Sequence, residues 1–343
     1  MNSRSSAKIK YLFFLFVIYI VSCQNQTDFR LTTLSGFTMG TTYHVKFLSL
    51  EKINIDEVKY KSDIDSILIQ VNNEMSTYID SSEISRFNRL GKNDWFPISN
   101  DFYNVLQVAL MLCEGTNGAY DITIGPLVNL WGFGPDIRNN IIPAQQKIDS
   151  VKNLVGYKYL ELRSKPKSMK KVIDGLYLDL SSIAKGFGVD KVSEFLLDSG
   201  INNFMVEIGG EVRTNGINQD NVIWEIGISA PDGSNSIATI IPLENKALAT
   251  SGSYNNFFEV AGKKFSHTID PRTGNPVTHN LVSVSVISNS CMLADGLATA
   301  IDVLGPVDGY NFALKEGIPI IMFINKNNEF NEKRTPAFQE LLK

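Results

Sequence analysis

Histidine and cysteine are scarce in this chain. It contains three of each in 343 residues, and no CxxC or HExxH spacing joins them. Because protein zinc sites take several histidine or cysteine ligands, this scarcity argues against a zinc centre. The sequence also lacks the GxSxG, GxxxxGKS/T and helix-opening GxGxxG motifs, which argues against a serine hydrolase, a P-loop NTPase and a dinucleotide-binding fold.

A strong excess of either charge is absent as well. Lysine and arginine number 32 against 36 aspartates and glutamates, for a net charge of −4. Nucleic-acid-binding proteins usually concentrate basic residues on one face, whereas here we interpret the short basic run 165–171 as a solvated loop or hairpin tip. With 43% hydrophobic residues and 12 prolines, the chain has the composition of a folded protein with one large domain or two closely packed ones.

One long hydrophobic run is present, at the amino terminus. Basic residues at positions 4, 8 and 10 precede Tyr11–Val21, which ends at Ser22-Cys23. The run is too short to span a bilayer, so we interpret it as part of a cleaved signal peptide. The sequence 20–23 resembles a bacterial lipoprotein signal, in which Cys23 would be acylated. The alternative is a soluble mature chain in which Cys23 is incidental.

These features predict three regions. Residues 1–22 are the signal peptide, 23–32 the lipidated cysteine with a short tether, and 33–343 one compact catalytic domain, since no repeat or low-complexity linker interrupts it. We therefore expect an exported protein of the bacterial cell envelope, lipid-anchored to a membrane and facing the periplasm or the exterior. Cys113 and Cys291 lie in apolar helical patterns, where buried thiols are more common than a disulfide.

Apolar periodicity predicts an α+β fold. Residues spaced as on one helix face predict helices over 64–76, 101–114, 143–155, 182–199, 291–304 and 309–316. Alternating or continuous apolar runs predict strands over 41–48, 204–208, 222–229, 237–242, 257–260, 264–268, 282–287 and 318–324, with further short strands within 157–180. Helices and strands do not alternate regularly, which argues against a doubly wound sheet and favours α+β.

An oxygen-rich pair lies in the helix predicted over 291–304. Asp295 and Thr299 are four residues apart, so a carboxylate and a hydroxyl point the same way, as suits a hard cation such as Mg²⁺. The alternative is that Asp295 caps the helix and Thr299 has no special role, because polar pairs at this spacing are common on solvated helices.

Two glycine-containing stretches have features suited to a phosphate and a planar ring. Asp179–Gly186 runs from strand into helix, where unpaired N–H groups and a lysine would favour an anion, although Ser181 or Ser182 is equally a simple N-cap. Gly118–Gly134 combines tight turns and aromatic residues with a carboxylate, which suits close backbone approach to a planar ligand. A buried structural loop is the alternative for that stretch.

A histidine lies in a third polar stretch, Ser266–Gly274. His267 ends a predicted strand and precedes a turn, and an imidazole there is suited to take a proton from an attacking hydroxyl near neutral pH. Most single histidines have no such role, so His267 alone does not establish a catalytic site.

Taken together and in order, these stretches resemble the ApbE family of FAD:protein FMN transferases. The resemblance covers nearly all of Thr33–Leu304 and also includes 39–43, 75–78, 208–211 and 294–300. It implies a single compact unit with a mixed, mostly antiparallel sheet and packed helices. It also implies attack by a threonine or serine hydroxyl of an exported acceptor protein on the FMN-side phosphorus of FAD, with release of AMP.

The resemblance assigns roles to particular residues. Magnesium is then held by the backbone carbonyl of Ala184 and by the side chains of Asp295 and Thr299, and His267 in Ser-His-x-Ile-Asp-Pro activates the acceptor hydroxyl. FAD contacts a larger set, namely Met39, Tyr78, Ala119, Tyr120, Asp121, Ser181, Phe187 and Ile269. The chain departs from the family at Ser181-Ser182, where two glycines are frequent, and at Gly296, where alanine is frequent. The two serine side chains narrow the approach to the diphosphate.

Other functions are compatible with some of the same motifs. An FAD pyrophosphatase would use water in place of the protein hydroxyl and give FMN and AMP. A non-catalytic flavin-binding lipoprotein would need neither a metal beside the phosphates nor a base, so the combination of Asp295, Thr299 and His267 disfavours it. A structural envelope lipoprotein would leave the motifs unexplained.

Overall fold

The computed structural model describes residues 29–135, 142–232, 234, 236–252, 257–260, 262–327 and 329–342. The predicted signal peptide, 1–22, and the predicted acylation site, Cys23, lie outside the described residues. Within the described ranges, no helix has the length and apolar character needed to cross a membrane. The first strand begins at Phe29, four residues before the predicted start of the catalytic domain.

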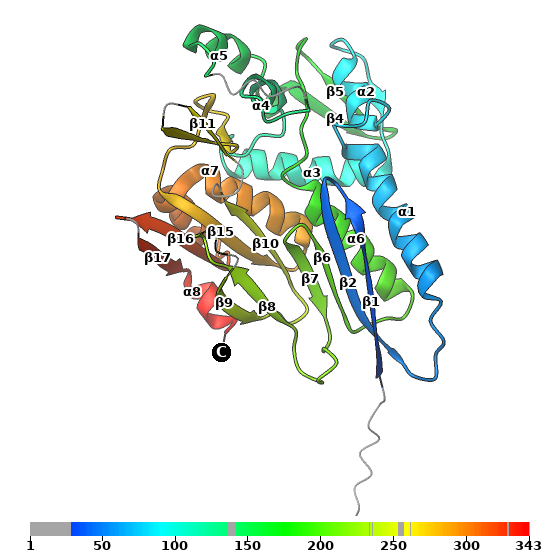
Figure 1. Ribbon diagram of the computed structural model, residues 1–343. Coiled ribbons are helices and arrows are strands. Elements are labelled where there is room, and N and C mark those ends of the chain that lie inside the picture. Colours follow the sequence, from blue (N-terminus) through cyan, green and yellow to red (C-terminus); the bar gives the residue numbers. More distant parts are fainter. Residues whose placement is uncertain are drawn as a thin grey trace, which may run out of the picture.

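An eight-stranded sheet forms the centre of the molecule (Figure 1). Every neighbouring pair in it is antiparallel. The strands, in spatial order, are β1 (Phe29–Thr38), β2 (Thr41–Leu50), β6 (Phe204–Ile208), β7 (Glu211–Asn215), β10 (Ala247–Gly252), β15 (Leu281–Ser288), β16 (Ile320–Lys326) and β17 (Glu329–Arg334). The α+β class and the antiparallel pairing expected from the sequence are confirmed.

The two faces of this sheet are covered differently. Because side chains alternate between faces, Ala249 and Val286 belong to the core under the long helices, whereas their neighbours Leu248 and Ile287 belong to a second core on the other face. The long helices are α1 (Glu57–Met75), α3 (Asn100–Gly115), α6 (Ala184–Asp198) and α7 (Cys291–Lys315). The other face is covered by β8 (Glu225–Ser229), β9 (Ile237–Pro242) and α8 (Pro336–Glu340).

Smaller elements lie beyond α3 and α7, at the top of Figure 1. One group contains α2 (Glu83–Arg89), β3 (Phe96–Pro97), the 3-10 turn Tyr157–Tyr159, β4 (Leu160–Ser164) and β5 (Lys167–Lys171). The other contains α4 (Gly125–Leu130), α5 (Gln145–Lys152), β11 (Phe257–Val260), β12 (Lys263–Ser266), β13 (Ile269–Asp270) and β14 (Asn275–Pro276). A buried aromatic cluster that includes Trp131, Phe258 and Phe265 holds the second group together.

Several local predictions are confirmed and others are corrected. The break expected at Gly305 is a kink within α7, where this glycine has φ 79°, and both Cys113 and Cys291 are buried free thiols. The sequence predicts Asn100 or Asp101 as the cap of α3, but the cap is Ser99, because the Ser99 hydroxyl accepts the Phe102 N–H. The alternative that Ser181 or Ser182 caps α6 is also wrong, since Ile183 occupies the cap position without a side-chain hydrogen bond.

The contact between α6 and α7 is close enough to require a glycine. A Cβ at Gly186 would lie 2.4 Å from the Cys291 carbonyl oxygen and 2.8 Å from Asp295 Cβ. We expect Gly186→Ala to lower the free energy of unfolding by about 1–3 kcal/mol because the helices must separate. Urea denaturation measures this change. Gly115→Ala, at the open end of α3 where an added Cβ meets nothing within 4 Å, is the matched control and should change stability little.

Candidate active site

The predicted metal pair lies where the start of α6 packs against α7. Asp295 is buried, and its Oδ2 accepts the Gly186 N–H at 2.9 Å. Thr299 follows one turn later on the same helix. Ala184, whose backbone carbonyl is the third predicted ligand, is the first residue of α6 and lies two positions before Gly186. The fold thus brings the start of α6, with Ala184, against the turn of α7 that carries Asp295.

A buried charge cluster surrounds this junction. Lys185 Nζ lies 3.1 Å from Glu211 Oε1 and 3.9 Å from Asp295 Oδ1. Burial raises the pKa of Asp295, and it raises the pKa of Glu211 to about 8. Burial alone would lower the pKa of Lys185, but the charges of Asp295 and Glu211 outweigh it and raise that pKa. Two carboxyl groups therefore compete for one ammonium group.

This donor set fits a hard cation. Asp295 Oδ1 is too far from Lys185 Nζ for a hydrogen bond, so it retains lone pairs, and Glu211 Oε2 is buried without a hydrogen-bond partner. At a pH above the raised pKa of Glu211, where both carboxyls are ionised, the cluster carries one negative charge in excess. Across the described residues, no three His, Cys, Asp or Glu side chains gather as a metal site. A cation with few protein ligands, such as Mg²⁺, suits that arrangement because it keeps water and phosphate oxygens in its shell.

The loop that carries Ala119, Tyr120 and Asp121 is buried beside the same junction. The Ser182 hydroxyl donates to Tyr120 Oη at 3.0 Å, which joins this loop to the turn before α6. Asp121 accepts the N–H and hydroxyl of Thr123 on one oxygen and the Tyr157 N–H on the other. Its carboxylate therefore orders the loop.

The turn before α6 differs from the sequence-based expectation of unpaired N–H groups. The N–H of Ser181 donates to Asp179 Oδ1, and those of Ile183 and Ala184 both donate to the Leu180 carbonyl. The Ser181 side chain is exposed, and Lys185 faces carboxylates instead of an open anion site. Any phosphate contact here must therefore come from side chains or from N–H groups other than these three.

The other predicted FAD contacts lie in several parts of the structure. Phe187, on α6, is buried in the core that Met39 also contacts, and Met39 Cε would lie 3.0 Å from a Cβ at Gly188. Tyr78 follows α1 and is 69% exposed. Ile269 belongs to the separate aromatic cluster.

His267 also belongs to that second region. Its ring lies edge-on to Phe133, with the ring centroids 6.3 Å apart. The following residue, Thr268, is hydrogen-bonded to Asp302 on α7 at 3.0 Å. His267 is therefore connected to the metal-pair helix through its neighbour in sequence.

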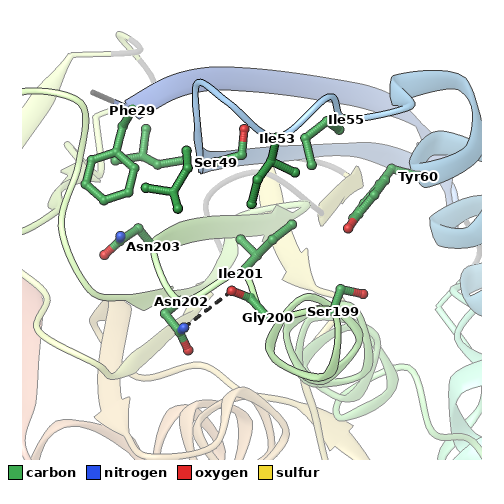
Figure 2. Close-up of a pocket in the computed structure, with 12 residues that line it drawn as sticks. Phe29, Ser49, Ile53, Ile55, Tyr60, Ser199, Gly200, Ile201, Asn202 and Asn203 are labelled. Carbon is green, nitrogen blue, oxygen red and sulfur yellow. Dashed lines mark hydrogen bonds between the residues drawn. The ribbon is translucent and has the colours of Figure 1, made fainter. Parts of the chain in front are cut away.

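A surface depression elsewhere contains none of these residues. It is lined by Phe29, Tyr60, Ser199 and neighbouring residues at the carboxyl end of α6 (Figure 2). Ala184 begins the same helix and Asp198 ends it, so the depression and the helix junction are separated by a helix of about 22 Å. We assign it no part in the site.

Sequence reasoning missed the pairing of Lys185 with Glu211. Glu211 follows Gly209-Gly210, whose φ angles of 58° and 101° form the turn between β6 and β7. A charged residue directly after two glycines is an available signal, but its partner is distant in sequence and only the folded sheet brings them together.

The chain belongs to the ApbE family, whose model matches residues 39–322. A relative from Vibrio cholerae named FAD:protein FMN transferase is 43% identical over 310 residues, covering 90% of this chain and 92% of the relative. One of the same name from Haemophilus influenzae is 42% identical over 327 residues, covering 94% of each chain. The solved flavin transferase ApbE from Vibrio cholerae superposes with a TM-score of 0.84 at 40% identity, covering 91% of this chain and 99% of that one.

Proposed function

We propose that this chain is a magnesium-dependent FAD:protein FMN transferase that modifies a threonine or serine hydroxyl of an exported acceptor protein and releases AMP. The observation that carries this proposal is the buried Asp295 carboxylate, one helical turn from Thr299 and against the start of α6. The names of the relatives support the flavin substrate and the transfer reaction.

The magnesium ion would be held by the backbone carbonyl of Ala184 and by the side chains of Asp295 and Thr299. When bound there, the ion supplies positive charge to phosphate oxygens and to the leaving phosphate. Glu211 keeps Lys185 in place beside Asp295 through its 3.1 Å ion pair. Replacing the Glu211 side chain would therefore disturb the geometry of the metal pair.

The bonds made and broken involve the acceptor hydroxyl and FAD. The hydroxyl oxygen attacks the FMN-side phosphorus, a new P–O bond forms, and the P–O bond to the AMP phosphate breaks. The hydroxyl proton passes to His267, since an un-ionised hydroxyl is a weak nucleophile. The proposed FAD contacts are Met39, Tyr78, Ala119, Tyr120, Asp121, Ser181, Phe187 and Ile269. Among these, Asp121 acts by ordering its loop.

The place of action follows from the amino-terminal sequence. We propose cleavage after Ser22, acylation of Cys23 and attachment to the bacterial cell envelope, where an exported acceptor would meet the enzyme. Incorporation of radiolabelled palmitate tests this proposal. The unaltered precursor should be labelled, and Cys23→Ser should not. Equal labelling of both would contradict it.

Product analysis distinguishes transfer from hydrolysis. Residues 24–343 are incubated with FAD, Mg²⁺ and a candidate exported flavoprotein, and AMP, free FMN and protein-bound flavin are quantified. We expect AMP to equal protein-bound flavin, with little free FMN. Free FMN equal to AMP, with an unmodified acceptor, would instead identify an FAD pyrophosphatase.

A further inference from the structure

A second buried carboxylate lies on α7 beyond the metal pair. Asp302 is completely buried. Its Oδ2 accepts the Thr268 hydroxyl at 3.0 Å and the Ser251 hydroxyl at 3.2 Å, while its Oδ1 is buried without a hydrogen-bond partner. Asp295, Thr299 and Asp302 have the spacing i, i+4 and i+7, which places them along one face of the helix.

The backbone of Asp302 is fixed as well. Pro306, four residues on, has no N–H to donate to the Asp302 carbonyl, and His279 Nε2 lies 2.7 Å from that carbonyl oxygen. Nε2 must therefore carry the proton, because a carbonyl cannot donate. A glycine is needed at position 305, since a Cβ there would lie 2.7 Å from the His279 ring and the residue has φ 79°.

Thr268 is held equally firmly on its own segment. Its N–H donates to Ser266 Oγ at 3.0 Å, and its carbonyl accepts the Val277 N–H at 3.0 Å. Thr268 is buried, with 6% of its surface exposed. The hydroxyl that it donates to Asp302 therefore holds the His267 side of this segment against α7, while Ile269 is held separately by its pairing with Pro276.

A purely structural contact at this position would not need a charged group. Burial raises the pKa of the Asp302 carboxyl, and leaving one of its oxygens unpaired adds to the cost of burying it. The residues on either side of Asp302 in the sequence, Ile301 and Val303, are buried and apolar. Burying the Asp302 carboxylate therefore costs free energy that an apolar side chain would not. We look for its role in the groups that it binds, the hydroxyls of Thr268 and Ser251.

We propose that Asp302 is a positioning residue for FMN transfer, which through Thr268 fixes the segment carrying His267 to the helix carrying Asp295 and Thr299. The inference rests on the proposed function. General-base catalysis depends on placing the base within hydrogen-bond reach of the attacking hydroxyl. The side-chain hydrogen bond between Thr268 and Asp302 connects the segment of the proposed base to the helix of the proposed metal pair.

The test removes the hydroxyl of Thr268 and retains its shape. We expect Thr268→Val to lower kcat for transfer about 10- to 100-fold, as loss of an orienting partner commonly does, with the KM for FAD and the bound FAD per chain nearly unchanged. Thr214→Val is the matched control, since Thr214, on β7 inside the central sheet, is also buried and donates its hydroxyl to the Leu243 carbonyl. It should leave kcat unchanged. Asp302→Asn, which keeps an acceptor oxygen, should retain more activity than Asp302→Leu.

A double substitution separates positioning from a general loss of structure. In a His267→Ala background, Thr268→Val should have almost no further effect on kcat, because its effect passes through the imidazole. An equal fold-loss in both backgrounds, or a loss of FAD binding in proportion to activity, would overturn the inference. If the unaltered protein transfers FMN and Thr268→Val matches Thr214→Val, only the positioning role fails. If the unaltered protein transfers no FMN, the proposed function fails and the positioning role fails with it.

Discussion

Asp295→Ala is expected to lower metal-dependent transfer by on the order of 10³-fold, because it removes the only carboxylate of the proposed magnesium site. The variant should still fold, since Asp295 contributes one side-chain hydrogen bond to the α6–α7 contact, from the Gly186 N–H. Initial rates over a range of Mg²⁺ concentrations measure the effect. The variant should show no saturable dependence on the metal.

The matched control for this variant is Asp308→Ala, which makes the same change at an exposed position of the same helix. It should have the activity and the Mg²⁺ dependence of the unaltered protein. Full activity of Asp295→Ala in the presence of excess chelator would contradict the metal assignment.

His267→Ala is expected to slow transfer about 10²- to 10⁴-fold, the usual contribution of a general base. FAD binding should weaken less than about threefold, because the imidazole is proposed to act on the acceptor hydroxyl and not on the flavin. Single-turnover transfer gives the transfer rate and equilibrium titration gives the affinity for FAD, both measured on the same preparations.

His44→Ala is the control for this second variant. His44 lies on β2, is exposed and pairs with Glu207 at 2.7 Å, so its loss should change neither quantity. Equal losses of transfer and of FAD affinity in His267→Ala would show that His267 is a binding residue and would remove it from the proton transfer.

Local sequence patterns predicted the helices α1, α3, α5, α6 and α7 and most of the longer strands, but not the short helices α2, α4 and α8. The apolar spacing over 64–76 and 291–304 corresponds to the buried faces of α1 and α7. The first strand, Phe29–Thr38, and the central strand Ala247–Gly252 were missed. Both contain small or hydroxyl residues, and they become strands because partners distant in sequence satisfy their backbone groups.

The site was predictable only where its parts are close in sequence. Asp295 and Thr299 share one helix, so their spacing alone suggested a joint role. The pairing of Lys185 with Glu211 and that of Thr268 with Asp302 join residues 26 and 34 positions apart, counted from their numbers. Such contacts depend on the order of strands and helices, which no local pattern specifies.

Mass spectrometry of the acceptor tests the central claim most directly. Residues 24–343, FAD, Mg²⁺ and the candidate exported flavoprotein are mixed, and the acceptor is digested and sequenced in the spectrometer with and without chelator. The account predicts one FMN on a threonine or serine through a phosphoester bond, absent when the metal is removed. An unmodified acceptor beside complete conversion of FAD, or an adduct that forms equally with chelator present, would contradict it.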